Sequence, residues 1–345
     1  MNPHIVAATA VAALFTLAAC AETPVAPVSN AGIKQIAPSF ARGAARPYTF
    51  SRFDVDAPFT FQTIPSGING DGVIVGWYSS GSACPAAPCP VKGFVLKDGL
   101  YTTVVYHNDA GTNAAVTQLR GVGPGGDIVG VYRMPGERGV NFHAFILTTD
   151  GQFVSVTNPD HISTMAQRIL PDGTILGCIH DTDQFLTMHG IWKGRNGFTV
   201  VPRATTMNNG GTPNGRTVTG FFTENPETLT PKGRGYVIDD GVFTGFDAPG
   251  SDFTEGWDMN PARTIVGRFE DAGTTNIHGY MLEKWSVSAG ALSGTYTTID
   301  FPLSASSNAP YTDVFGINAA GDIVGKFRET ATGPFHGYIA TRKTD

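Results

Sequence analysis

The strongest constraint on the fold is a motif that recurs six times along the chain. Two mostly apolar residues precede a glycine, and an aromatic residue usually follows two positions later, as in Ile74-Val-Gly76-Trp-Tyr78. An internal repeat of roughly 40–50 residues is typical of β-propellers and other repeat folds. The spacing of the motif glycines agrees with such a period. They are Gly76, Gly130, Gly177, Gly220, Gly267 and Gly325.

Each repeat contains three further strand-like segments. We label the four segments a to d in chain order, with the glycine motif on segment b. Segment c starts with a basic, a small and a large apolar residue, and turn signals such as Asn69-Gly-Asp-Gly72 separate the segments. Four short strands in such a repeat have the size of one propeller blade. The basic residues of segment c are Lys92, His143, His189, Arg234, His278 and His336.

The two ends of the repeat region complement each other. The sixth repeat ends with the c segment at His336 and has no d segment, whereas Phe50-Ser-Arg-Phe53 is a d segment that precedes the first repeat. In a ring, an N-terminal strand that completes the last blade removes an exposed sheet edge. The sequence therefore predicts an all-β fold, a six-bladed β-propeller with four-stranded blades over residues 48–345, closed by the N-terminal strand.

Composition supports an all-β fold and excludes several alternatives. The 345 residues include 43 Gly and 23 Pro, and only 15% are charged. Frequent glycine and scarce charge argue against long helices and coiled coils, and the 41% hydrophobic content argues against disorder. The net charge of −6 gives no electrostatic reason to expect a nucleic acid partner.

The N-terminus has the pattern of an export signal. Residues 1–19 contain a short apolar run that is too short to span a bilayer, and Leu17-Ala-Ala-Cys20 resembles a bacterial lipobox. This resemblance implies lipidation of Cys20 and attachment to the outer membrane, on its periplasmic or cell-surface side. The alternative is an ordinary signal peptide and secretion. Residues 20–47, rich in Ala and Pro, are expected to form a flexible tether.

Three other cysteines follow. In an exported protein, Cys84 and Cys89 are expected to form a disulfide across the Pro-rich loop between them. Cys178 lies in an apolar run and is expected to be buried. We predict no cofactor, and no metal site at the segment c histidines, because Lys92 and Arg234 take the same place in other repeats. A recurrent hydrogen bond to a neighbouring loop explains such a position better.

The repeats resemble the HAF-type extracellular repeat of bacterial proteins, whose pattern is approximately gIN..G.IVG.Y…HGF…G.FT.ID.PGA. Residues 242–250 and 296–302 match the end of this pattern, and the resemblance extends over the chain after residue 47. It implies an extracytoplasmic repeat protein and carries no catalytic residues with it.

Candidate functional residues are those that break the repeat on segment a, which lines the central channel of a propeller. One position, at a fixed distance before the b glycine, holds threonine in every repeat but the fourth, where Met207 takes its place. This recurrence indicates a structural role. The residues one and three positions later vary and share a strand face. Those with polar or aromatic side chains are Gln118, Arg120, Gln167, Asn208, Glu255, Trp257, Asp313 and Phe315.

This set predicts a binding site for a polar ligand such as a sugar, with rings that stack on it and amides and acids that bind its hydroxyls. The sequence thus favours a monomeric, lipid-anchored binding or interaction module for glycans or envelope proteins. The alternative is an extracytoplasmic hydrolase or lyase, acting on polysaccharide or a small ester, with Glu255 and Asp313 as general acid and base.

Overall fold

The computed structural model describes residues 34–35, 48–57, 60–80, 90–182, 187–226, 232–303 and 311–343. In these ranges the regular structure is β-strand, and there is no helix long and apolar enough to cross a membrane. The strands form five sheets, and neighbouring strands are antiparallel with one exception. The protein is therefore all-β, as predicted.

The largest sheet contains two groups of four strands. Among the described residues, the one strand pairing between its halves is the parallel pairing of Val91 with Val116. The strands are β3 (Thr60–Ile68), β4 (Ile74–Ser80), β5 (Val91–Lys97), β6 (Leu100–Val104), β7 (Val116–Val122), β8 (Ile128–Arg133), β9 (His143–Leu147) and β10 (Phe153–Ser155).

Three separate four-stranded sheets follow along the chain. The first contains β11 (Ser163–Ile169), β12 (Ile175–His180), β13 (Met188–Gly194) and β14 (Gly197–Val200). The second contains β15 (Thr206–Gly211), β16 (Thr217–Glu224), β17 (Lys232–Asp239) and β18 (Val242–Phe246). The third contains β19 (Ser251–Met259), β20 (Ile265–Asp271), β21 (Ile277–Ser288) and β22 (Ala291–Ile299).

The last sheet combines both ends of the described chain. Its strands are β23 (Thr312–Ile317), β24 (Ile323–Phe327), β25 (His336–Arg342), β2 (Tyr48–Phe53) and β1 (Lys34–Gln35). Strand β2 pairs with β25 from Tyr48↔Arg342 to Phe53↔Gly337. The segment that sequence analysis assigned to the missing d position therefore lies beside the sixth c segment.

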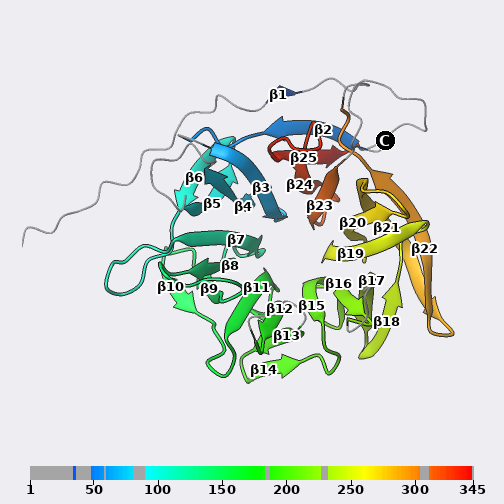
Figure 1. Ribbon diagram of the computed structural model, residues 1–345, viewed down its shortest axis with the longest axis horizontal. Coiled ribbons are helices and arrows are strands. Elements are labelled where there is room, and N and C mark those ends of the chain that lie inside the picture. Colours follow the sequence, from blue (N-terminus) through cyan, green and yellow to red (C-terminus); the bar gives the residue numbers. More distant parts are fainter. Residues whose placement is uncertain are drawn as a thin grey trace, which may run out of the picture.

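The sheets are arranged around a common axis, as in a β-propeller (Figure 1). The six segment a strands β3, β7, β11, β15, β19 and β23 lie nearest that axis, and each contacts the next, including β23 with β3. The b, c and d strands follow outward in order. The predicted repeat thus corresponds to four-stranded units with one strand at the centre.

The recurring b glycines mark a close approach between strands. At Gly177, a Cβ would overlap the carbonyl oxygen of Met165 on the facing a strand, and the other five b glycines meet an equivalent carbonyl. The cause is a β-bulge on each a strand, since each pairing register shifts by one residue there. A bulge pushes the backbone of one strand toward its partner, so only glycine fits opposite it.

The pairing corrects one predicted register. Gly177 pairs with Ala166, and four other b glycines pair at the same separation, but Gly220 pairs with Asn208, one position further back along the chain. In the fourth repeat, Thr206 therefore takes the position of the recurrent threonine, and Met207 takes the variable position after it. The sequence pattern had placed Met207 and Asn208 there. With this correction the threonine recurs in all six repeats. The hydroxyls of Thr63, Thr117, Thr164, Thr206, Thr254 and Thr312 each accept a hydrogen bond from a backbone N–H.

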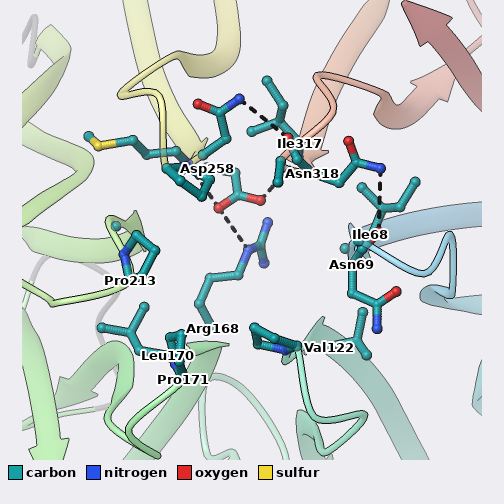
Figure 2. Close-up of a pocket in the computed structure, with 18 of the residues that line it drawn as sticks. Ile68, Asn69, Val122, Arg168, Leu170, Pro171, Pro213, Asp258, Ile317 and Asn318 are labelled. Atoms are coloured by element: carbon teal, nitrogen blue, oxygen red, sulfur yellow. Dashed lines mark hydrogen bonds and ion pairs between the residues drawn. The ribbon is translucent and has the colours of Figure 1, made fainter.

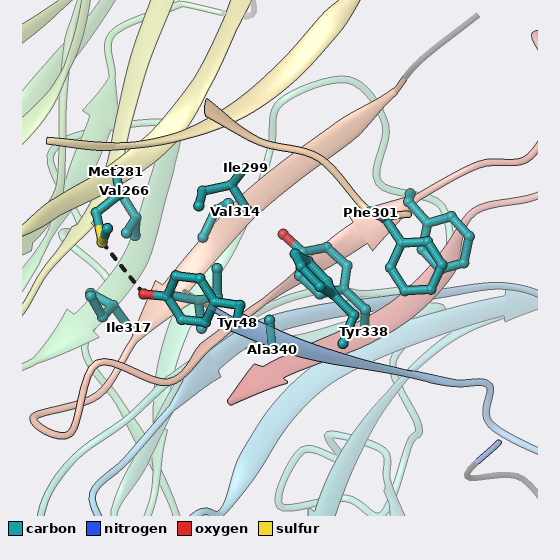
Figure 3. Close-up of a cluster of buried hydrophobic side chains, with 12 residues drawn as sticks. Tyr48, Val266, Met281, Ile299, Phe301, Val314, Ile317, Tyr338 and Ala340 are labelled. Carbon is teal, nitrogen blue, oxygen red and sulfur yellow. Dashed lines mark hydrogen bonds between the residues drawn. The ribbon is translucent and has the colours of Figure 1, made fainter. Parts of the chain in front are cut away.

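The hydrophobic core is divided into clusters, the largest of which joins the last sheet to its neighbour (Figure 3). The rings of Phe50 and Tyr338 lie 5.7 Å apart, and Phe301 stacks on Phe327 at 3.6 Å. Met281 from the adjacent sheet packs against Tyr48, whose hydroxyl donates to the Gly321 carbonyl at 2.9 Å. Strand β2 is thus held by buried aromatic contacts as well as by its backbone pairing.

Candidate functional site

Two residues that break the repeat meet at the axis of the molecule (Figure 2). The residue after each bulge is glycine in four repeats, and the approach there is close: a Cβ on Gly67 would lie 3.1 Å from the Cα of Gly121. In the other two repeats this position holds Arg168 and Asp258. Their side chains meet, with Nε of Arg168 3.2 Å from Oδ1 of Asp258 (Figure 2).

The guanidinium of Arg168 connects the central strands. Nη1 donates to the carbonyls of Arg120 at 2.8 Å and Gln167 at 2.7 Å. Nη2 donates to the carbonyl of Ser66 at 3.0 Å and also to that of Phe315. These bonds and the ion pair with Asp258 connect Arg168 to five of the six segment a strands, its own strand β11 included. Buried charge is stable only when paired and hydrogen-bonded, and Arg168 meets both conditions.

Two cavities lie on opposite sides of Arg168 along the axis. The turn-side cavity, of about 210 Å³, is lined by residues at and beyond the bulges, among them Asn69, Pro171 and Asn318 (Figure 2). The second, which we call the cationic cavity, has a volume of about 200 Å³. It is lined by Ile64, Ser66, Trp77, Arg120, Gln167, Arg168, Trp257, Arg268, Asp313, Phe315 and Lys326.

The cationic cavity brings together five of the eight residues predicted to bind a ligand. Arg120, Gln167, Trp257, Asp313 and Phe315 of the predicted set line it. All of these except Asp313 are bulge residues, as is the lining residue Ser66. A bulge changes the direction of a side chain, so it aims these residues at the axis.

Three predicted residues do not line the cavity. Gln118 accepts a hydrogen bond from Nη2 of Arg120 at 2.6 Å, and Glu255 accepts one from Nε1 of Trp257 at 3.0 Å, so each contacts a lining residue. Asn208 was assigned to the channel by the register error described above. It is buried between its own sheet and the preceding one, where its amide donates to the Ile191 carbonyl of β13 at 3.1 Å and it accepts from Tyr236 of β17.

Residues on segment b complete the charge pattern, and the sequence prediction missed them. Arg268 lies 2.6 Å from Oε2 of Glu255 and 3.8 Å from Oδ1 of Asp313. Lys326 lies 3.2 Å from Oδ2 of Asp313, and its ammonium is 4.2 Å from the centre of the Phe335 ring. The sequence does contain a signal for Arg268 and Lys326. Only in the fifth and sixth repeats does a charged residue directly follow the b glycine.

Burial acts to lower the pKa of three cations at the cavity, and nearby carboxylates oppose this effect to different degrees. Burial, together with the nearby charge of Arg168, lowers the pKa of Arg120 to about 10. Burial also lowers the pKa of Lys326, although Asp313 opposes this effect. For Arg268, burial acts in the same direction, but Glu255 and Asp313 outweigh it and raise its pKa. The positive charge of Arg268 is thus strongly compensated by carboxylates, whereas the positive charge of Arg120 is not.

The basic residues of segment c mostly pair with acidic side chains, and most of these acids lie in loops. His143 contacts Glu137 at 2.7 Å, and His336 contacts Asp54 at 2.9 Å. His278 lies between Asp300 at 2.8 Å and Asp271 at 3.2 Å. Contacts of this kind agree with the predicted structural hydrogen bond. In the described ranges, no three His, Cys, Asp or Glu residues are grouped to hold a metal ion.

The other predicted sites are the four cysteines of the chain. Cys178 is buried, as expected. Cys20, predicted to be lipidated, most of the predicted tether, and Cys84 and Cys89, predicted to form a disulfide, lie outside the described residues.

No family model matches the chain, and the search of curated proteins found no match. Several solved structures are similar in overall shape. A gluconolactonase from Xanthomonas campestris has 13% identity and a TM-score of 0.48, over 93% of this chain and 100% of that one. The propeller domain of the trilobed protease from Pyrococcus furiosus has 10% identity and a TM-score of 0.44, over 83% and 98%. A Trypanosoma rangeli sialidase has 8% identity and a TM-score of 0.47, over 84% and 55%.

Proposed function

We propose that the protein is an extracytoplasmic binding module that holds a small polar ligand in the cationic cavity. The supporting observation is that four residues which break the repeat line this one cavity: Arg120, Gln167, Trp257 and Phe315. Its volume of about 200 Å³ is below the roughly 300–1,000 Å³ of sites for drug-sized ligands, so the ligand is small.

A sugar fits this lining. Trp257 and Phe315 are in contact edge to face, with ring centres 4.9 Å apart, and offer apolar surface to a sugar ring. The amide of Gln167 and the carboxylate of Asp313 offer groups that bind hydroxyls. Calorimetric titration of the full chain with a panel of monosaccharides tests the proposal, and saturable binding of at least one sugar is expected. A complete absence of binding would contradict it.

The hydrolase or lyase alternative depends on Glu255 and Asp313. Both carboxylates contact Arg268, and Glu255 also accepts the hydrogen bond of Trp257. These contacts favour a role in holding the cations and Trp257 in place over a role in proton transfer. If the protein turns over any polysaccharide or ester, the double variant E255Q/D313N distinguishes the two roles. Loss of turnover with ligand binding retained would support the alternative.

We further propose six blades of four strands, in which the eight-stranded sheet counts as two blades and β2 closes the last. The pairing of β2 with β25 and the contact of β23 with β3 support this arrangement. The likeness to HAF-type repeats is part of the same proposal, and rests on the motifs described above.

We also propose that Cys20 carries a lipid anchor at the outer membrane. The lipobox-like sequence supports this placement. In a bacterial host, the wild-type chain should fractionate with membranes and label with palmitate, whereas C20S should be soluble and unlabelled. Equal labelling of both chains would contradict the anchor, and the disulfide-site variant C84S/C89S serves as a control for thiol loss.

A further inference from the structure

The charges around the cationic cavity do not balance. Three cations have carboxylate partners: Arg168 with Asp258, Arg268 with Glu255, and Lys326 with Asp313. Arg120 makes no ion pair among the described residues, and its side chain donates only to the neutral amide oxygen of Gln118 at 2.6 Å. The cavity therefore carries one positive charge in excess.

Two hydrogen-bond donors at the cavity are also unpaired. Nε of Arg120 and Nε1 of Trp77 are buried and have no partner among the described residues. Leaving a buried donor unpaired destabilises a protein, so a ligand that accepts from such groups gains affinity. A carboxylate has two acceptor oxygens and matches the fork of a guanidinium.

The remaining lining determines what kind of anion fits. Apart from the ion pairs with Lys326 and Arg268, neither carboxylate oxygen of Asp313 accepts a hydrogen bond within the described residues, so both can accept from ligand hydroxyls. The same carboxylate, together with Glu255, repels a compact dianion such as phosphate. The apolar rings of Trp257 and Phe315 require a carbon skeleton beside the anionic group.

We infer that the ligand is a hydroxycarboxylate of monosaccharide size, such as a uronic acid, whose carboxylate pairs with Arg120. Its ring lies against Trp257 and Phe315, and its hydroxyls donate to Asp313. This inference rests on the proposed function and specifies the ligand of that same site.

The experiment is a calorimetric titration of the full chain at pH 7. The probes are D-glucuronate and D-galacturonate, their neutral counterparts D-glucose and D-galactose, the methyl ester of D-glucuronate, and inorganic phosphate. At least one acid is expected to bind at least tenfold more tightly than its neutral counterpart, and the ester of glucuronate should lose that advantage. The ester comparison uses wild-type protein and does not depend on the folding of any variant.

Variants of Arg120 test whether this side chain causes the preference for the acid over the neutral sugar. R120M should remove the tenfold preference for the acid, while R120K, which keeps the charge but not the fork, should retain part of it. The matched control is R216Q, because Arg216 is mostly exposed and pairs with Asp240 on the surface. R216Q should bind as the wild type does.

The outcomes separate the two proposals. Neutral sugars that bind as tightly as the acids, or phosphate that binds more tightly than both, would overturn the hydroxycarboxylate and leave the binding module standing. An acid preference that survives in R120M would overturn the role of Arg120. If none of the probes binds, both this inference and the proposed function are wrong.

Discussion

Single residues in this protein fall into two classes, those that recur in every repeat and those that occur once. The b glycines and segment a threonines belong to the first class and serve the backbone, by admitting a bulge or by accepting an N–H. Arg120, Arg168 and Asp258 belong to the second class and lie at the axis. Residues that break the repeat are therefore the candidates for a functional role in this protein.

The b glycines should not tolerate a methyl group. In G177A, the new Cβ would overlap the Met165 carbonyl and approach the Ala166 Cα at 3.2 Å. We therefore expect the free energy of unfolding to fall by about 1–3 kcal/mol, which is typical of overpacking. The control is G70A, because no atom lies within 4 Å of a Cβ at that position. Its free energy of unfolding should differ from that of the wild type by about 0.5 kcal/mol or less. Urea unfolding measures both, and equal midpoints would refute the argument.

His278 should make stability depend on pH. The hydrogen bond that His278 donates to Asp300 raises the pKa of His278 against the opposing effect of burial, and Asp271 adds to the rise. A histidine with a raised folded pKa stabilises the native state fully below its unfolded pKa, near 6.5, and loses this effect as pH rises through the folded value. The free energy of unfolding should fall between pH 6 and 9 more steeply in wild type than in H278Q. Parallel curves would exclude this role.

At the scale of elements, the unusual strand is β2. It lies at the opposite end of the repeat region from β25, yet pairs with it along its whole length and contributes Tyr48 and Phe50 to the largest core cluster. An unpaired β25 would expose a row of backbone donors and acceptors to other chains. The N-terminal strand thus protects the edge of the last sheet.

Truncation of Phe50 should show how strongly β2 is held. Its ring is buried against Phe301 and Tyr338, with ring centres 5.7 Å away in both cases, so F50A should lower the free energy of unfolding by about 3–5 kcal/mol. The matched control is F61A, since Phe61 is 51% exposed. F61A should change stability by about 0.5 kcal/mol or less. A small effect of F50A in denaturant unfolding would show that β2 contributes little to the fold.

At the scale of the whole molecule, the contacts converge on the axis. Arg168 and Asp258 come from strands β11 and β19 and connect to β3, β7 and β23 through backbone groups. This network separates the two cavities and fixes the inner strands relative to one another. The geometry of the cationic cavity therefore depends on residues from all around the molecule.

A double-mutant cycle tests the axial pair. R168M leaves Asp258 buried without its counter-charge, which should cost about 3–5 kcal/mol. The double variant R168M/D258N should be less destabilised than the sum of the single variants, because no unpaired charge remains. The exposed pair Arg216–Asp240 is the control, and its cycle should give about 1 kcal/mol or less. Additive effects at Arg168 and Asp258 would show that the pair is not coupled.

The sequence by itself determined the repeat, the four strands of each unit, the place of the N-terminal strand and five of the residues that line the cavity. These features follow from local patterns, since glycine, turn residues and alternating apolar residues act over a few positions. Only the tertiary structure decided the bulges, the one-residue shift that moves Asn208 away from the axis, and the pairing that leaves Arg120 with excess charge. These depend on contacts between strands far apart in the sequence, where one inserted residue changes which side chain faces the axis.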